Sequence, residues 1–385
     1  MPRLVSAESV TEGHPDKIAD RIADTVLDAY LTADPRSRVA CEVLVTTGLV
    51  MLAGEIGSHA NLEVSEYVRD AIREIGYTDP AMGFDADGCA VISALHRQSG
   101  DIARGVERSQ ELRRGSRDHY DSLGAGDQGI MFGYATTETH ELMPLPITLA
   151  SRIVRRLAEV RKSRLLAYLR PDGKAQVTLA YDGEEPVAVT TVVLSAQHAK
   201  DVSSETLEGD LRDHVLKPAL GEHWVSDDIE VLINPSGGFV TGGPHGDTGL
   251  TGRKIVADTY GAGYAHGGGA FSGKDPTKVD RSATYFARYI AKNVVAAGLA
   301  RRCLVELAYA IGRAHPVGLR VETYGAVRDE GKLTALVKER FDARPAAIIE
   351  RLGLAGPIYT ATSAYGHFGR PEFPWEDTSA ARTLI

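Results

Sequence analysis

Residues 267–282, G-G-G-A-F-S-G-K-D-P-T-K-V-D-R-S, carry the groups that a polyphosphate site requires. Three consecutive glycines expose backbone N–H groups to an anion, and the segment adds three cations and two carboxylates. These charged residues are Lys274, Lys278, Arg281, Asp275 and Asp280. Amides and cations suit phosphate oxygens, and carboxylates suit the magnesium that a polyphosphate carries. The segment predicts a phosphate-binding loop, the alternative being a solvated turn rich in glycine and lysine.

Two glycine patterns match nucleotide motifs in their letters but not in their context. Residues 268–275 nearly spell a P-loop, but Asp275 stands where a hydroxyl should hold the metal, and no apolar strand precedes them. Residues 124–129, G-A-G-D-Q-G, fit a dinucleotide motif, yet polar residues precede them and the strand-like I-M-F-G-Y-A-T-T follows. Both motifs are rejected, and Asp127 stays open as a ligand-binding carboxylate or as part of a tight turn.

The sequence V-T-E-G-H-P-D-K predicts that a helix begins at Pro15, with His14 at its N-cap. Helix N-termini attract phosphate through their free amides and the helix dipole. His14 could then donate a hydrogen bond to a leaving oxygen while Asp16 holds a metal. The alternative is that His14, Asp16 and Lys17 serve only the helix end.

Glu42 and Glu55 lie on two predicted strands that the dipeptide Thr-Gly joins. A two-residue turn places both carboxylates on one face of the hairpin, whereas a three-residue turn would separate them. Carboxylates among apolar residues require cations or donors, because their desolvation is costly. One of them could hold a monovalent cation and the other a ligand ammonium group.

Two short basic segments complete the candidate site. R-P-D-G-K has the composition of a turn. Asp172 and Lys174 in it could contact a ribose or phosphate, the alternative being an ordinary hairpin tip. L-T-G-R-K places the adjacent cations Arg253 and Lys254 at the start of a short helix, just after Asp247.

The composition describes a soluble chain with a local basic site. The 385 residues are 43% hydrophobic and 25% charged, with a net charge of −9, which argues against general binding of nucleic acid or membrane surfaces. Cys41, Cys89 and Cys303 are far apart, lack metal-ligand spacing and predict buried thiols in a reducing compartment. No apolar run suggests a signal core or a membrane span, so we expect a cytoplasmic protein.

One order of elements recurs three times along the chain. The predicted helices are 15–31, 62–75, 146–161, 204–216, 282–297 and 333–341. The predicted strands are 38–46, 49–56, 89–95, 175–181, 187–194, 230–233, 303–311 and 319–324. The first helices of the three copies are separated by about 130 residues, which is too long for a solenoid repeat.

These repeats predict an α+β fold of three related domains, each with helices on one face of a mostly antiparallel sheet. The expected domains are residues 1–98, 123–241 and 242–385. The polar segment 99–122 is rich in arginine and longer than an ordinary connector, so it is either a mobile functional loop or disordered. Its arginines either contact an anion or form a solvated charge run.

Taken together, the motifs resemble the S-adenosylmethionine synthetase family over nearly the whole chain. The matching segments are E-G-H-P-D-K-I-A-D, A-C-E, G-E-I, G-A-G-D-Q-G-I-M-F-G-Y-A, G-G-P-H-G-D-T-G-L-T-G-R-K, the 267–282 loop and A-Y-G-H-F-G-R. The resemblance implies three structurally repeated α/β domains around a pseudo-threefold axis. It also implies a homodimer or a dimer of dimers with active sites at the dimer interface.

The resemblance further implies an enzyme that joins ATP and L-methionine into S-adenosylmethionine and then hydrolyses triphosphate to phosphate and diphosphate. Two Mg²⁺ ions per site and K⁺ would assist, with Asp16 and Asp280 at magnesium and Glu42 at potassium. The implied catalytic residues are His14, Lys174, Arg253, Lys254 and Lys274. The implied ATP-binding residues are His14, Asp172, Lys174, Phe239, Asp247, Arg253, Lys254, Ala270 and Lys274. The implied methionine-binding residues are Glu55, Gln98, Asp127, Asp247 and Lys278.

Three positions depart from the family's usual pattern. Gly238 stands where a basic residue is usual, and His245 and Thr248 flank Asp247 where other residues are more common. The segment that begins at Gln98 corresponds to the family's flexible gating loop but is longer and richer in arginine. Two other functions stay open on the residues alone: a phosphotransferase that releases ADP, and a nucleotide sensor without turnover.

Overall fold

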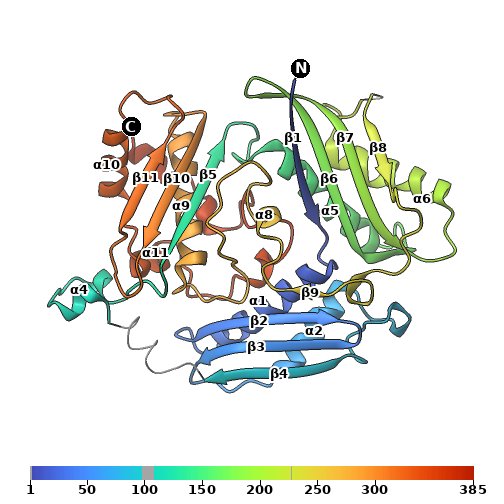
Figure 1. The fold of residues 1–385 in the computed structure, drawn as a ribbon, viewed down its shortest axis with the longest axis horizontal. Helices are drawn as coiled ribbons and strands as arrows, with labels where there is room; N and C mark the ends of the chain where they lie inside the picture. Colours follow the sequence, from blue (N-terminus) through green and yellow to red (C-terminus); the bar gives the residue numbers. More distant parts are fainter. Residues whose placement is uncertain (1, 98–107, 227) are drawn as a thin grey trace.

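A computed structural model describes residues 2–97, 108–226 and 228–385. Its strands form three separate sheets that surround a centre containing α8 (Ile255–Asp258) and part of α1 (Pro15–Ala33) (Figure 1). Strand pairing is antiparallel except for β3 with β4 and β7 with β8, so the predicted α+β fold of mostly antiparallel sheets is confirmed. Within the described residues, no helix is both long and apolar enough to cross a bilayer.

The first sheet has the order β4-β3-β2-β9, with α1 and α2 packed on one face. Its strands are β2 (Arg38–Thr46), β3 (Leu49–Gly57), β4 (Ala90–Arg97) and β9 (Gly249–Leu250), and α2 is Val64–Ile75. Thr46 pairs with Leu49, which confirms the two-residue turn, and Glu42 pairs with Ala53. Glu42 and Glu55 are therefore both exposed on the sheet face opposite α1.

The second sheet has the order β1-β6-β7-β8. Its elements are β1 (Arg3–Val10), β6 (Leu169–Asp182), β7 (Glu185–His198), β8 (Glu230–Ile233), α5 (Leu145–Lys162), α6 (Ser204–Leu211) and α7 (Lys217–Leu220). The prediction of a turn at R-P-D-G-K is wrong, because these residues lie inside β6. A register shift between Leu169 and Gly173 accommodates Pro171, which cannot donate a ladder hydrogen bond, so the strand continues past it.

The third sheet has the order β11-β10-β5. Its elements are β5 (Gly129–Thr136), β10 (Arg302–Tyr309), β11 (Gly318–Glu322), α9 (Val279–Ala296), α10 (Glu330–Arg340) and α11 (Pro345–Arg351), and α4 (Gln110–Arg113) lies beside it. Gly133 lets α9 approach β5, since a Cβ there would lie 1.9 Å from the carbonyl carbon of Ala287. Residue 98 and most of the first half of segment 99–122 lie outside the described residues.

Each sheet contains one strand from a different part of the chain. The N-terminal β1 joins the second sheet, β5 joins the third, and β9 returns to the first. The exchange is cyclic among the three expected segments, which agrees with an arrangement around a pseudo-threefold axis.

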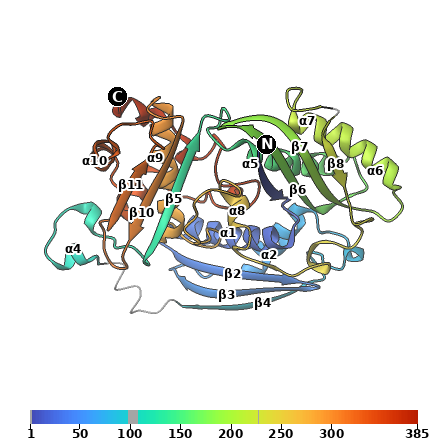
Figure 2. The same cartoon turned by 45° about the horizontal axis from the view of Figure 1, so that its top comes forward.

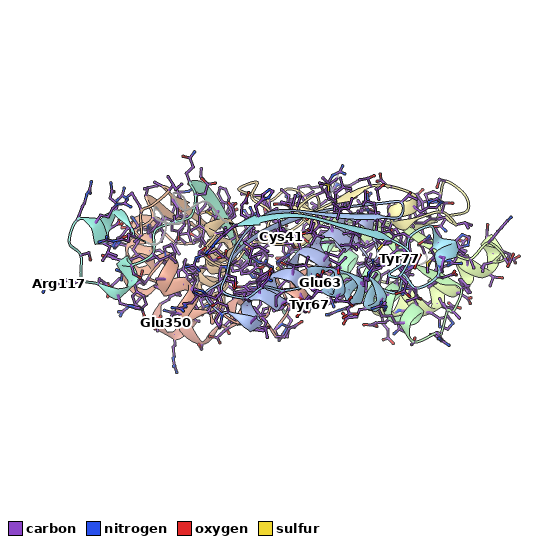
Figure 3. The ribbon with its side chains drawn as sticks, turned by 90° about the horizontal axis from the view of Figure 1, so that it is seen from below. Cys41, Glu63, Tyr67, Tyr77, Arg117 and Glu350 are labelled. Carbon is purple, nitrogen blue, oxygen red and sulfur yellow. The ribbon has the colours of Figure 1, made fainter. Side chains whose placement is uncertain are left out.

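The long helices α1, α2, α5 and α9 lie behind the sheets in the view of Figure 1, and Figure 2 shows them on the same side after the turn. Seen from below, the molecule is a flat slab (Figure 3). One buried apolar cluster joins the first and third sheets with their helices, and a second fills the space between the second sheet and α5 to α7. The opposite faces of the sheets stay open, and Met51, Ile92 and Leu250 are exposed on that of the first sheet.

Candidate active site

The N-terminus of α1 fixes His14 in one tautomer. His14 is the N-cap residue as predicted, and its Nδ1 accepts the backbone N–H of Asp16 at 3.2 Å. Burial, reinforced by Lys254, lowers the pKa of His14 to about 4, so the ring is neutral at pH 7. Since Nδ1 accepts a hydrogen bond, the proton of the neutral ring lies on Nε2. His14 can therefore donate a hydrogen bond from Nε2 to a ligand.

Asp16 joins the first turn of α1 to β9 and to the segment between β9 and α8. Its Oδ1 accepts the backbone N–H of Leu250 at 3.0 Å, and its Oδ2 lies 2.5 Å from Nζ of Lys254. Arg253 Nη1 lies 3.9 Å from the same carboxylate and is largely exposed. Burial would raise the pKa of Asp16, but the hydrogen bonds from Lys254 and Leu250 outweigh burial and hold it below its ordinary value. A carboxylate and two cations thus meet beside His14.

Lys174 enters this group from the paired strands β1 and β6. It lies opposite Val10 in the register, and its Nζ lies 2.7 Å from Glu8 on β1. Glu8, Gln176, Arg253 and Lys254 help to line a cavity of about 460 Å³. That volume is within the range of small-molecule sites. We call His14, Asp16, Lys174, Arg253 and Lys254 the His14 group.

The register shift in β6 buries Asp172 near Lys254. Its Oδ2 accepts the backbone N–H of Gly243 at 2.8 Å, and its own N–H donates to Gln197. Burial raises the pKa of Asp172 to about 6. Asp247 is exposed, and its backbone N–H donates a hydrogen bond to the carbonyl of the same Gly243 that contacts Asp172. Phe239 is held beside β7 by two hydrogen bonds with His198.

The glycine-rich loop gathers a second set of charges at the edge of the first sheet. Lys274 forms a bridge with Ala40 of β2, and its Nζ lies 2.8 Å from Asp280 in the first turn of α9. Gly269 packs on Asp280, because a Cβ there would lie 2.5 Å from its carboxylate. Desolvation raises the pKa of Glu42, and the positive charge of Lys274 partly opposes it.

Lys278 and Asp127 lie next to these residues. Lys278 directly precedes α9 and pairs with Asp275, while the Thr277 carbonyl lies against Gly126, the neighbour of Asp127. Asp127 itself is exposed. We call Glu42, Asp127, Lys274, Lys278 and Asp280 the Lys274 group.

Three charged residues within these motifs are buried in the interior and cannot contact a ligand. Lys17 is buried between Asp20 and Asp258, and Arg281 is fully buried against Asp24. Asp275 is also fully buried and accepts hydrogen bonds from Val39, Thr277 and Lys278. The prediction that Arg281 faces phosphate and Asp275 faces magnesium is therefore wrong, and Lys17, for which no ligand was predicted, pairs inside the fold. Contacts with distant segments hold these side chains in the interior, which local sequence does not reveal.

The two groups are close in the fold but not bonded to each other. Gly252, with φ of +77°, packs on Ala270, because a Cβ at Gly252 would lie only 2.5 Å from the Cβ of Ala270. Among the described residues, no hydrogen bond or ion pair joins the His14 group to the Lys274 group. Glu55 lies further along the open face on β3, and Gln98 lies outside the described residues.

The donor sets decide what kind of metal these groups could hold. Among the described residues, no three His, Cys, Asp or Glu side chains form a metal cluster. Asp16 and Asp280 each offer one carboxylate with a lysine beside it. Magnesium is commonly bound by one or two carboxylates and completes its shell with substrate phosphates and water. The residues therefore fit magnesium that arrives with a nucleotide, and not a site built from protein ligands alone.

Several residues that shape the site were missed by sequence reasoning. Glu8 pairs with Lys174, and Asp20 and Asp24 hold the loops that precede the cations. The spacing of aspartates at 16, 20, 24 and 28 along one predicted helix was the available signal. It was not informative without the loops that cross the helix.

Three family models match consecutive parts of the chain. The model described as "S-adenosylmethionine synthetase, N-terminal domain" matches residues 2–100. The central-domain model matches residues 122–239, and the C-terminal-domain model matches residues 241–377. Together the matches extend over most of the 385 residues.

Full-length relatives carry the same name. An "S-adenosylmethionine synthase" of Thermus thermophilus is 63% identical over 385 residues, covering 99% of this chain and 98% of the relative. The protein of that name from Deinococcus deserti is 57% identical over 398 residues, covering 100% of this chain and 98% of the relative. A relative from Deinococcus radiodurans is 57% identical, covering 99% and 97%.

Proposed function

Because this chain belongs to the S-adenosylmethionine synthetase family and forms S-adenosylmethionine from ATP and L-methionine, we propose that its two cationic groups act together on the triphosphate of ATP. The thioether sulfur of methionine is already a competent nucleophile and needs no base. The barrier lies in the triphosphate, which must leave C5′ of the ribose. Catalysis is thus mainly the neutralisation of charge that grows on the leaving oxygen.

His14 acts at that leaving oxygen in this proposal. Its neutral ring, with Nδ1 occupied by the Asp16 N–H and Nε2 free to donate, is the single observation that carries the proposal. A donor fixed before reaction stabilises developing charge without reorganisation. Lys174, Arg253 and Lys254 bind the phosphate oxygens next to it. The adenosine moiety would occupy the adjacent cavity, with Asp172 near the ribose, and Phe239 and Ala270 also contacting ATP.

The Lys274 group completes the site from the other side of the phosphates. Lys274 binds phosphate oxygens, and Asp16 and Asp280 would hold two Mg²⁺ ions. When bound, the metal supplies positive charge that polarises the phosphate oxygens. Glu42 would hold K⁺, consistent with its place beside Lys274. After the sulfonium forms, the same cations hold triphosphate for hydrolysis to phosphate and diphosphate.

Methionine would lie on the open side of the first sheet. We assign its binding to Glu55, Gln98, Asp127 and Lys278, with Asp247 facing both substrates. A carboxylate suits the ammonium group of methionine, and a lysine suits its carboxylate. Exposure of Glu55 and Asp127 to solvent supports their availability to a ligand.

We also propose that two chains share each site in a homodimer, which could pair again as a dimer of dimers. The open face of the first sheet exposes Met51, Ile92 and Leu250 on the side that carries Glu42 and Glu55. An apolar face of this kind is typical of an interface. Among the residues that the structure describes in one chain, moreover, no hydrogen bond or ion pair joins the His14 group to the Lys274 group. The buried thiols of Cys41, Cys89 and Cys303 suit the cytoplasm as the location.

Product analysis tests the function directly. The protein is incubated with ATP, Mg²⁺ and K⁺, with and without methionine, and the products are identified by mass spectrometry. We expect an adenosyl sulfonium, phosphate and diphosphate only when methionine is present. Release of ADP would instead indicate phosphotransfer, and tight ATP binding without a methionine-dependent product would indicate a sensor.

A further inference from the structure

Helix α1 carries four aspartates at intervals of four residues, which we call the aspartate ladder: Asp16, Asp20, Asp24 and Asp28. Each one accepts a backbone N–H from a strand or loop that crosses the helix. The donors and distances are Leu250 to Asp16 at 3.0 Å, Gly252 to Asp20 at 2.9 Å, Gly273 to Asp24 at 2.8 Å, and Tyr359 and Thr360 to Asp28 at 3.0 and 2.7 Å.

Helix geometry explains why consecutive members of the ladder meet different loops. A step of four residues rises about 6 Å and turns about 40° beyond one full turn. The ladder therefore winds slowly around α1. Asp16 meets Leu250 of β9, Asp20 meets the segment between β9 and α8, Asp24 meets the glycine-rich loop, and Asp28 meets the C-terminal segment.

The two middle aspartates are buried and are paired with buried cations. Asp20 is paired with Lys17, whose Nζ lies 3.0 Å away and also contacts Asp258 of α8. Asp24 is paired with Arg281 of α9 through two hydrogen bonds of 2.7 and 3.0 Å. In both pairs, the carboxylate and the cation have at most 2% of their surface exposed. These four residues are Lys17, Asp20, Asp24 and Arg281. Solvent therefore screens these contacts little.

The loop residues that the ladder holds come directly before the phosphate-binding cations. Gly252 precedes Arg253 and Lys254, and Gly273 precedes Lys274. A hydrogen bond to the glycine amide fixes the backbone from which each cation extends. Both glycines have positive φ, of +77° and +80°, so their loops are sharply bent at these points.

We propose that Asp20 and Asp24 are positioning residues that hold Arg253, Lys254 and Lys274 in place before substrate binds. Neither carboxylate is accessible to substrate, and each acts through the loop amide that it accepts. The inference rests on the proposed function, because it assigns these three cations to the triphosphate. A single helix would thereby set the geometry of both cationic groups.

Asp28 provides a matched control on the same helix. It accepts two backbone amides where each of the others accepts one, but its donors are Tyr359 and Thr360, and their segment carries no proposed site residue. Asp28→Asn, Asp20→Asn and Asp24→Asn are compared for thermal unfolding, for turnover, and for binding of inorganic tripolyphosphate with Mg²⁺ by calorimetry. Misplacement of a catalytic group by about 1 Å can cost about 100-fold in rate.

We expect all three variants to unfold at lower temperature than the wild type. Asp20→Asn and Asp24→Asn should also lose about 10- to 100-fold in turnover and in tripolyphosphate affinity, measured where each is folded. Asp28→Asn should keep both within about twofold. If folded Asp20→Asn and Asp24→Asn match Asp28→Asn in turnover and in tripolyphosphate affinity, the proposal is overturned. If the wild-type protein forms no sulfonium product, the proposed function is overturned instead.

Loss of one partner from a buried ion pair can prevent folding. In that case the pairs are replaced whole by side chains that cannot accept the loop amide, as Lys17→Met/Asp20→Leu/Asp258→Asn and as Asp24→Leu/Arg281→Met, and the same losses are expected. A further test uses the wild-type protein and therefore does not depend on whether a variant folds. Deuterium exchange of the Gly252 and Gly273 amides in the free enzyme should be as slow as in the core of α1, and fast exchange of both amides would overturn the proposal.

Discussion

At the level of single residues, His14 has two tasks that can be separated by substitution. Its Nδ1 caps α1, and its Nε2 is free to donate to a leaving oxygen. Asn is a good N-cap residue but cannot reproduce the Nε2 donor at the same reach. We expect His14→Asn to keep the stability of the protein within about 0.3 kcal/mol, because Asn caps well, and to lower turnover by about 10²–10³-fold.

Thermal unfolding and initial rates with ATP and methionine check this prediction. His14→Ala serves as the comparison, because it should lose the cap as well as the donor, at a cost of about 1 kcal/mol. Near-normal turnover in His14→Asn would remove His14 from the leaving-group role.

Asp172 predicts a pH dependence of stability. Burial raises its pKa from 3.8 to about 6, so between these values the folded protein keeps a proton that the unfolded chain releases. Its contribution to stability is complete below pH 3.8 and is lost as pH rises through 6. Relative to Asp172→Asn, the wild-type free energy of unfolding should fall by about 1 kcal/mol from pH 5 to pH 7.

Urea unfolding of both proteins at several pH values measures this difference. A difference that is flat with pH would mean that the Asp172 pKa is ordinary in the folded state. His14 titrates with the opposite sign, since its pKa is lowered, but it contributes equally to both proteins and cancels.

At the level of elements, the close contact between the start of α1 and β9 brings Asp16 to Lys254. A Cβ on Gly249 would lie 2.1 Å from the carbonyl carbon of Pro15, so any side chain must push β9 away from the helix. Gly249→Ala should cost about 1–3 kcal/mol and reduce turnover, because both partners of the Asp16–Lys254 contact move.

Gly209 gives the matched control for that substitution. It lies inside α6, and nothing lies within 4 Å of a Cβ built on it. Gly209→Ala should stabilise the protein by about 0.5–1 kcal/mol and leave turnover unchanged. Chemical denaturation of the two variants tests the pair, and equal stability in both would show that β9 yields without cost.

At the level of the whole molecule, sharing of the site between subunits predicts that two inactive variants can complement each other. His14→Asn removes a residue of the His14 group, and Lys274→Ala removes one of the Lys274 group. In a mixed dimer, one site receives His14 from one chain and Lys274 from the other. Random pairing should then restore about a quarter of the wild-type turnover.

The two variants are co-refolded from denaturant, and turnover is compared with that of each variant refolded alone. No recovery in a sample that contains mixed dimers would mean that each chain builds a complete site. Sedimentation of the wild type checks that the protein is the dimer on which the expected recovery of a quarter is based.

The family, the repeated α+β architecture and the start of α1 followed from the amino-acid sequence, because each depends on local pattern. A Pro that follows an N-cap residue favours the start of a helix through local geometry, as at Pro15. The two-residue Thr-Gly turn likewise fixed the register of Glu42 and Glu55. Motifs with many glycines and charges identified which segments could bind phosphate. Local spacing could not show whether Lys17, Arg281 and Asp275 face solvent or the interior.

Only the tertiary structure decided how distant segments meet. The exchange of β1, β5 and β9 among the sheets depends on pairings between residues that are more than a hundred positions apart. The partners of Asp20 and Asp24 come from loops more than two hundred residues away. Such contacts form because buried carboxylates and loop amides must each find a hydrogen-bond partner in the folded chain, and the sequence around either group does not name the other.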